Sequence, residues 1–138
     1  MNRNDFQQLA QIRLEDAEAL LQKGCYSGAY YLAGYAVECG LKACIAKQTR
    51  KYDFPPEPAT IREIDVHNID TLLKSAGLKH AFDEDVKHDK KLEVTRAVAS
   101  RWNERSRYEE HTETEARDLY KAITDKRHGV LQWISQHW

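Results

Sequence analysis

The sequence predicts an all-α protein, built as an antiparallel bundle of four or five helices in one domain. Three observations support this fold class. Apolar residues recur at intervals of three and four along most of the chain. No alternating strand pattern of useful length and no internal repeat is present. The length of 138 residues suits one hydrophobic core, so residues 1–138 are expected to form a single domain.

The first two helices are expected over residues 4–23 and from about residue 26 to residue 48. Gly24 follows the first of them as a C-terminal stop. The second has a broad face of small and apolar residues, so it is expected to lie at the centre of the bundle and to pack closely. That face consists of Ala29, Leu32, Ala33, Ala36, Val37, Gly40, Leu41, Cys44 and Ile45.

A connector is expected over residues 50–66. This stretch holds all three prolines of the chain, which remove backbone donors and restrict the residues before them, so no long helix can cross it. A short helix is expected over residues 69–76. Its end is predicted by Gly77, with Leu78 placed to make the hydrophobic contact of a C-terminal cap.

The charged segment 79–88 does not predict one conformation. Its histidines and acidic residues, together with Asp89, suggest a metal cluster as one interpretation. No recognisable ligand pattern is present, so a solvated face is the favoured interpretation. Helical spacing returns at Leu92 and is expected to end near Trp102.

The last helix is expected to be long and unbroken, over residues 112–138. Thr112 and Glu115 have the spacing of a capping box at its start. One apolar face then continues to Trp138. At 1.5 Å per residue such a helix measures roughly 35 to 40 Å.

The formal net charge is -1, so any binding of anions must come from a local patch. One patch is predicted near residues 96–108, because guanidinium groups suit phosphate contacts and aromatic rings suit base stacking. Glutamates in the same stretch offer the alternative of a solvated, ion-paired surface. The residues concerned are Arg96, Arg101, Trp102, Arg105, Arg107 and Tyr108, with Glu104, Glu109 and Glu110.

Two further features bear on location and redox state. The chain starts with polar residues, and no apolar run approaches the ~18 residues of a membrane span, so a cytoplasmic protein without a membrane segment is expected. Cys25, Cys39 and Cys44 are odd in number and lack the spacing of metal ligands. They are expected to be buried, reduced thiols.

Three segments, in this order along the chain, resemble the HEPN family (higher eukaryotes and prokaryotes nucleotide-binding). The first is similar to the family's second helix, where a run of small residues precedes Glu and Lys, here Glu38 and Lys42. The second resembles its short helix led by a histidine, and the third its loop from Trp to Arg-Tyr before the last helix. The segments are GCYSGAYYLAGYAVECGLKAC (24–44), HNIDTLLKSAGL (67–78) and WNERSRY (102–108).

The resemblance implies a four- to five-helix up-and-down bundle that forms a homodimer, with the functional cleft at the subunit interface. Many members of the family are ribonucleases that need no metal, and no cofactor is expected. Their motif is an Arg, four to six residues, then a His, which Arg105 and His111 match. Ser106 stands where the family usually has Asn or Asp. Glu113 stands where members regulated by nucleotidyl modification have Tyr, so that control is not expected here.

RNA cleavage without metal needs a base for the ribose 2′-OH proton and a cation for the pentacoordinate phosphate. His111 would be the base, and Arg105 would stabilise the charge. The family resemblance implies that a dimer brings two such Arg–His pairs together. One pair would then provide the base and the other pair the acid.

Glu38 has two interpretations. It lies four residues before Lys42, the favourable order for an ion pair within a helix. The resemblance also suggests that it orients an arginine of the segment 102–108. His67 is expected to be a helix cap or a packed imidazole outside the site.

Two function classes follow from these features. The first is a metal-independent endoribonuclease, the toxin of a two-gene module whose antitoxin resembles a nucleotidyltransferase. The second is a non-catalytic module that holds a nucleotide, RNA or a partner protein in the same cleft. The expected catalytic residues are Arg105 and His111, and the expected binding residues are Arg101, Trp102, Arg107, Tyr108 and Glu38.

Overall fold

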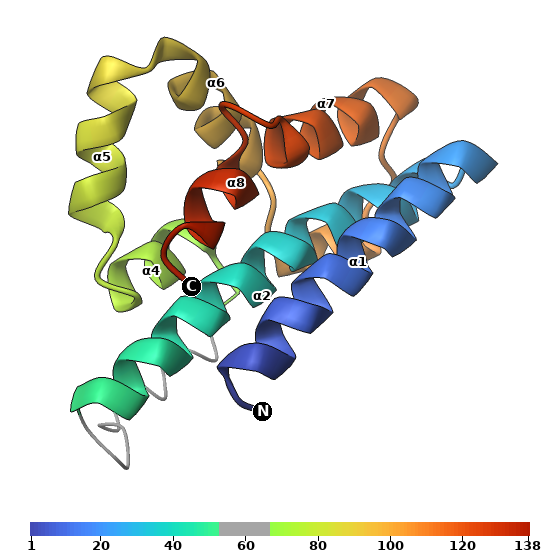
Figure 1. The fold of residues 1–138 in the computed structure, drawn as a ribbon. Helices are drawn as coiled ribbons and strands as arrows, with labels where there is room; N and C mark the ends of the chain where they lie inside the picture. The colour runs from blue at the N-terminus through green and yellow to red at the C-terminus, as the bar shows by residue number, and fades with distance from the viewer. Residues whose placement is uncertain (53–66) are drawn as a thin grey trace.

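The computed structural model describes residues 1–52 and 67–138, and these residues are all-helical (Figure 1). They form seven α-helices and one 3₁₀ helix, with no strand among them, so the predicted all-α class is confirmed. The number of helices is higher than the expected four or five. The elements are α1 (Arg3–Lys23), α2 (Tyr26–Tyr52), α4 (Ile69–Ser75), α5 (Lys79–His88), α6 (Lys90–Ser100), η1 (Glu104–Tyr108), α7 (Glu113–Thr124) and α8 (Val130–Ser135).

Helices α1 and α2 form an antiparallel pair that runs the length of the molecule (Figure 1). A capping box between Asn2 and Asp5 starts α1. Gly24 ends it with a φ of 77°, a left-handed conformation that glycine adopts without steric cost, as predicted. α2 continues to Tyr52 and so includes the first three residues of the expected connector. The rest of that expected connector, 53–66, lies outside the described residues.

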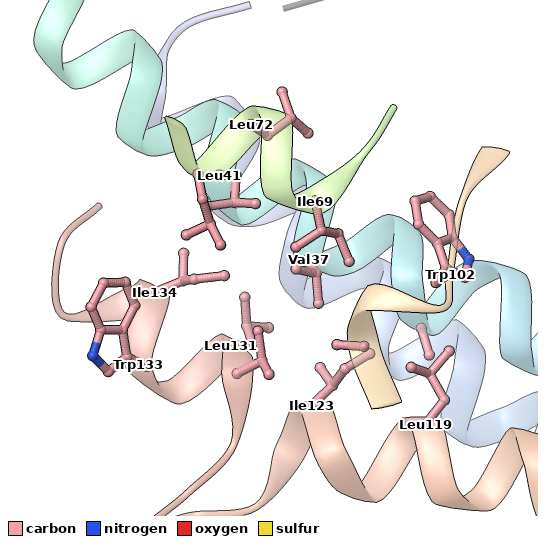
Figure 2. Packing of buried hydrophobic residues seen from close by; sticks show 14 of the residues in the cluster. Val37, Leu41, Ile69, Leu72, Trp102, Leu119, Ile123, Leu131, Trp133 and Ile134 are labelled. Atoms are coloured by element: carbon pink, nitrogen blue, oxygen red, sulfur yellow. The ribbon is translucent and has the colours of Figure 1, made fainter. Parts of the chain in front are cut away.

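Helix α2 is the centre of the bundle and contacts α1, α4, α7, α8 and η1, as the sequence predicts. Two of its glycines allow neighbours to approach closely. A Cβ atom at Gly34 would lie 2.2 Å from the indole of Trp102, and one at Gly40 would lie 2.8 Å from a methyl group of Leu131. Figure 2 shows the core on this helix; its labelled residues are Val37, Leu41, Ile69, Leu72, Trp102, Leu119, Ile123, Leu131, Trp133 and Ile134.

The middle of the chain forms three short helices, α4, α5 and α6. Gly77, with a φ of 69°, follows α4, and the buried Leu72 and Leu73 hold that helix on α2. The charged segment 79–88 is helical and its Phe82 is fully buried, which settles its conformation. Asp89 is the N-cap of α6. The helix ends at Ser100, two residues before Trp102, near which its end was expected.

The end of the chain forms two helices, which corrects the prediction of one unbroken helix over residues 112–138. Between α7 and α8, Asp125 accepts hydrogen bonds from the backbone N–H groups of Arg127 and His128, at 2.9 and 2.7 Å. Gly129 closes this turn, because a Cβ atom there would lie 2.4 Å from the carbonyl oxygen of Asp125. The apolar pattern of the sequence does not indicate this turn, because buried residues occur at helical spacing in both α7 and α8.

The cysteines and the helix lengths bear on two further expectations. Cys39 and Cys44 are buried and free, as expected, but Cys25 is exposed because it lies in the turn between α1 and α2. In the described part of the chain, no helix combines the length and the apolar character that a membrane crossing requires.

Candidate functional site

Trp102 anchors the segment that carries the predicted site. Its indole lies against Gly34 and stacks on Tyr31, with ring centroids 6.0 Å apart, and its Nε1 donates a hydrogen bond to the Tyr31 carbonyl oxygen at 3.1 Å. Only 1% of Trp102 is exposed. The prediction that this ring binds a base is therefore corrected: the ring is part of the core and leaves no face open for stacking (Figure 2).

The next residues form the 3₁₀ helix η1, where the sequence predicts a loop. A reciprocal cap holds it: Asn103 Oδ1 accepts the backbone N–H of Arg105 at 2.8 Å, and Ser106 Oγ accepts the backbone N–H of Asn103 at 3.4 Å. Ser106 is 3% exposed. Ser106 thus has a local structural role as part of this cap.

η1 exposes guanidinium groups and one aromatic ring. The side chains of Arg101 and Arg105 are exposed and make no hydrogen bond or ion pair with the described residues. Arg107 is paired with Glu104 at 3.2 Å, and its guanidinium lies 4.7 Å from the ring centroid of Tyr108. Tyr108 is 78% exposed. Among the described residues, this surface therefore has two cations without an ion-pair partner, one paired cation and an open aromatic ring.

Arg96, the first arginine of the predicted patch, lies elsewhere. It forms an ion pair with Asp83 of α5, and its guanidinium lies 5.0 Å from the ring centroid of Phe82. Asp70 of α4 is 3.8 Å away. Arg96 therefore joins three helices and does not belong to the surface around η1.

His111 is enclosed between α2 and the start of α7. Its ring stacks on Tyr30, with centroids 3.7 Å apart and an angle of 15° between the planes, and its side chain is 6% exposed. The backbone N–H donates to Ser27 Oγ at 2.9 Å. A capping box between Thr112 and Glu115 starts α7 directly after it, as predicted.

Two carboxylates flank the His111 ring. Nδ1 lies 3.2 Å from Glu115 Oε2, and this hydrogen bond is the main reason why the pKa of Glu115 is lowered. Nε2 lies 3.8 Å from Glu109 Oε2 and has no hydrogen-bond partner in the described residues. When Nδ1 carries the proton, Glu115 holds that tautomer and Nε2 keeps a free lone pair.

Arg101 belongs to the surroundings of His111. The phenol of Tyr30, on which the imidazole stacks, has a raised pKa, first because of burial and then because of Glu115 and Glu109. Arg101 opposes this shift, so its charge acts on the same group. No contact joins the side chains of Arg105 and His111 in the described structure; Arg105 lies in η1, whereas His111 lies in the connection between η1 and α7.

Glu38 lies inside the bundle, with 1% of its surface exposed. Its Oε1 accepts a hydrogen bond from Lys42 Nζ at 2.7 Å, which confirms the predicted pair within α2. The same oxygen lies 2.6 Å from His67 Nδ1. The hypothesis that Glu38 orients an arginine of the segment 102–108 is corrected, because its partners among the described residues are Lys42 and His67. A buried position also excludes it from direct contact with RNA in this structure.

His67 connects Glu38 with η1. Its Nε2 lies 3.7 Å from Glu104 Oε2, and Glu104 is the partner of Arg107. His67 therefore joins a buried carboxylate to the arginine-bearing helix, a role that the sequence did not predict because the partners are 29 and 37 positions away. The N-cap of α4 is Asn68 and not His67; Asn68 Oδ1 accepts a hydrogen bond from the backbone N–H of Thr71 at 3.1 Å.

A second group that the sequence analysis missed lies on α1 and α2. Tyr31 and Tyr35 stack with ring centroids 6.1 Å apart. The guanidinium of Arg13 lies 6.0 Å from the Tyr35 ring centroid. Tyr31 also stacks on Trp102, which directly precedes the cap of η1, so this group adjoins η1. Its only signal in the sequence is the spacing of the two tyrosines, which also fits a packed helix face.

The acidic segment considered as a metal cluster has other contacts. Asp83 pairs with Arg96, Asp85 accepts the Trp133 Nε1 hydrogen bond at 2.7 Å, and Asp89 is 2.8 Å from His128 Nδ1. Within residues 1–52 and 67–138 no group of three or more His, Cys, Asp or Glu side chains is arranged to hold a metal ion. These carboxylates hold helices together and are more than a solvated face.

Comparison of the chain with protein-family models, with curated proteins and with solved structures finds no match. The resemblance to HEPN proteins accordingly rests on the three sequence segments. The first of them lies mainly in α2, the second includes α4, and the third consists of Trp102, Asn103 and η1. All three meet at α2, since α4 and η1 both contact that helix.

Proposed function

We propose that this chain is a HEPN-type domain that binds a nucleotide or RNA through the surface around η1. The observation that carries the proposal is the pair of exposed guanidinium groups of Arg101 and Arg105, which make no hydrogen bond or ion pair with the described residues. The enclosed imidazole of His111 follows in the next connection along the chain. Free guanidinium groups bind phosphate oxygens, and the open ring of Tyr108 suits stacking on a base. Following the resemblance, the working form is a homodimer with two such surfaces across its cleft.

The finer proposal is metal-independent endoribonuclease activity. His111 Nε2 takes the proton of a ribose 2′-OH, the 2′-oxygen forms a bond to phosphorus, and the bond from phosphorus to the 5′-oxygen breaks. Arg105 stabilises the pentacoordinate phosphate, and the second copy's histidine protonates the leaving 5′-oxygen. The products are a 2′,3′-cyclic phosphate and a 5′-hydroxyl. The hydrogen bond from Nδ1 to Glu115 supports this role, because it leaves Nε2 as the basic nitrogen.

A non-catalytic binding module is the second candidate, and one observation favours it. The side chain of His111 is only 6% exposed, so its Nε2 must be uncovered before it can reach a ribose. In that case Arg101 and Arg105 bind the ligand while His111 and Tyr30 stabilise the start of α7. A nucleotidyltransferase-like protein, the antitoxin of a two-gene module, is the proposed partner in either case, and it rests on the resemblance alone.

The test is incubation of the purified protein with structured RNA in EDTA, together with binding of the same RNA measured by fluorescence anisotropy. The variants are Arg105→Ala, His111→Ala and His111→Gln, the last because the imidazole packs on Tyr30. Arg127→Ala is the matched control, an exposed arginine in the turn between α7 and α8. Thermal unfolding of each variant identifies loss of the fold.

Cleavage by the wild type that Arg105→Ala and both His111 variants abolish supports the nuclease. Binding without cleavage, weakened by Arg105→Ala but not by Arg127→Ala, supports the binding module. A wild type that neither binds nor cuts RNA and binds no nucleotide overturns the proposal. Size-exclusion chromatography with light scattering tests the homodimer. A monomer at micromolar concentration would contradict the proposed cleft between two subunits.

A further inference from the structure

Aromatic rings and guanidinium groups alternate on the surface next to η1. Three elements contribute to it: α1, α2 and η1. Tyr31 and Tyr35 stack on each other and are partly exposed, and Tyr108 is 78% exposed. We call this surface the stacking face; it consists of Arg13, Tyr31, Tyr35, Arg107 and Tyr108.

Neighbouring side chains hold the rings of the stacking face in place. Tyr31 stacks on the buried indole of Trp102, and the Tyr31 carbonyl oxygen accepts that indole's N–H. Arg13 lies over the Tyr35 ring, and Arg107 lies over the Tyr108 ring. Rings that are already oriented lose little conformational entropy when a flat ligand stacks on them.

The guanidinium groups of the stacking face are both neutralised. Arg13 is ion-paired with Asp16 at 2.8 Å, and Arg107 is ion-paired with Glu104 at 3.2 Å. The two arginines and their two acids sum to zero formal charge. A ligand gains little here from phosphate neutralisation, so the chemistry of this face favours flat, aromatic groups over bare phosphate.

We infer that the stacking face binds unpaired nucleobases of an RNA strand whose phosphates lie at Arg101 and Arg105. This inference rests on the proposed function and adds a binding subsite to it. Unpaired bases expose their faces to aromatic side chains, whereas the bases of a duplex stack on one another. The two parts of the surface then contribute differently: the stacking face contributes affinity that salt does not screen, and the unpaired arginines contribute affinity that salt weakens.

The experiment measures binding of a short, unstructured, 2′-O-methylated RNA by fluorescence anisotropy over a range of salt concentrations. The 2′-O-methyl group removes the nucleophile, so binding is measured without cleavage. The same strand annealed to its complement is the duplex probe. The variants are Tyr35→Leu, which keeps an apolar side chain, and Arg13→Gln, which keeps both rings; Arg105→Ala reports on the proposed function.

The chain offers a matched control for Arg13→Gln. Arg117 of α7 lies 5.9 Å from the Tyr26 ring centroid and is ion-paired with Glu113 at 3.5 Å, an arrangement much like that of Arg13. Arg117→Gln therefore removes an equivalent guanidinium outside the stacking face. Thermal unfolding midpoints are measured for all variants.

We expect Tyr35→Leu to weaken single-strand binding about tenfold at every salt concentration, without changing the slope of log affinity against log salt. Arg13→Gln also weakens single-strand binding, because the Tyr35 ring loses the guanidinium that lies over it, and Arg117→Gln has no effect. Arg105→Ala instead reduces the slope by about one. The duplex binds more weakly than the single strand.

Three results overturn the inference, and the first two separate it from the proposed function. If Tyr35→Leu and Arg13→Gln bind like the wild type while Arg105→Ala is weakened, the stacking face is wrong and the RNA surface stands. The same conclusion holds if the duplex binds as tightly as the single strand. If the wild type binds neither probe, the stacking face and the binding of RNA around η1 are both wrong.

Discussion

Nδ1 of His67 lies 2.6 Å from Oε1 of Glu38, a carboxylate of which 1% is exposed. The same oxygen accepts a hydrogen bond from Lys42, and the other carboxylate oxygen has no partner among the described residues. Through Glu104 the contact reaches η1. A buried charge in the central helix therefore holds together the start of α4 and the segment that carries Arg105.

Glu38→Ala should strongly destabilise the protein, because it leaves the partly buried amine of Lys42 and the imidazole of His67 without their acceptor. Breaking a buried pair in this way costs about 3 kcal/mol. The free energy of unfolding from urea titration measures the effect. Glu15→Ala, on the exposed side of α1, is the control and should stay within about 0.5 kcal/mol of the wild type. A similarly small effect of Glu38→Ala would contradict the structure.

Gly34→Ala should destabilise the protein by about 3 kcal/mol, because the added methyl group would meet the Trp102 indole at 2.2 Å and that ring is enclosed. Gly28→Ala is the matched control in the same helix. Its nearest neighbour is a Leu20 methyl group at 3.3 Å, and alanine raises helix propensity by up to about 1 kcal/mol. Urea titration of both variants measures the difference. Equal stability of the two variants would show that the Trp102 indole does not pack against Gly34 of α2.

The three thiols should differ in reactivity. Burial raises the pKa of the Cys39 and Cys44 thiols to about 12, and both side chains are enclosed, whereas Cys25 is exposed. At pH 8 iodoacetamide should therefore add one carbamidomethyl group per native chain, and three after unfolding in urea. Intact mass spectrometry counts the groups. Rapid double or triple modification of the folded protein would place at least one of these two thiols at the surface.

The pair of Asp89 and His128 should make stability fall in acid. The hydrogen bond from His128 is the largest cause of the lowered pKa of Asp89, followed by the backbone N–H of Leu92. Because the folded pKa lies below the unfolded value of about 3.9, the stabilisation is present above that value and is lost as pH falls through the folded pKa. Asp89→Asn keeps a side chain that caps helices well and removes the charge.

Thermal midpoints measured from about pH 6 to about pH 3 should therefore show a gap between wild type and Asp89→Asn that closes below about pH 4. Asp118→Asn, an exposed position on α7, is the control. A constant gap at all pH values would mean that the charge of Asp89 contributes nothing.

Local sequence signals predicted several helix ends correctly. Gly24 and Gly77 adopt left-handed conformations where they were expected to end helices, and Thr112 and Glu115 form the expected capping box. These signals act within a few residues, so a single sequence contains them. The turn at Asp125 and Gly129 was missed, because the core accepts apolar residues at helical spacing on both sides of a short turn.

The candidate site was predicted less well than the fold. Arg101, Arg105, Arg107 and Tyr108 are exposed, as a binding surface requires. Trp102 and Glu38 were assigned to the same surface, but both are buried. An arginine-rich, aromatic segment has the same composition whether its tryptophan faces solvent or core, and only the packing on α2 distinguishes the two. The assignment of Arg105 and His111 as catalytic residues stays a prediction.

The sequence by itself determined the helical class, the central position of α2 and the helix ends marked by a cap or a glycine, because periodicity and capping are properties of neighbouring residues. The tertiary structure alone decided which side chains of the HEPN-like segments are exposed. It placed His67 between Glu38 and Glu104, and His111 on Tyr30. It also assembled the stacking face from three separate elements. Such contacts join residues that are distant along the chain, so no local pattern encodes them.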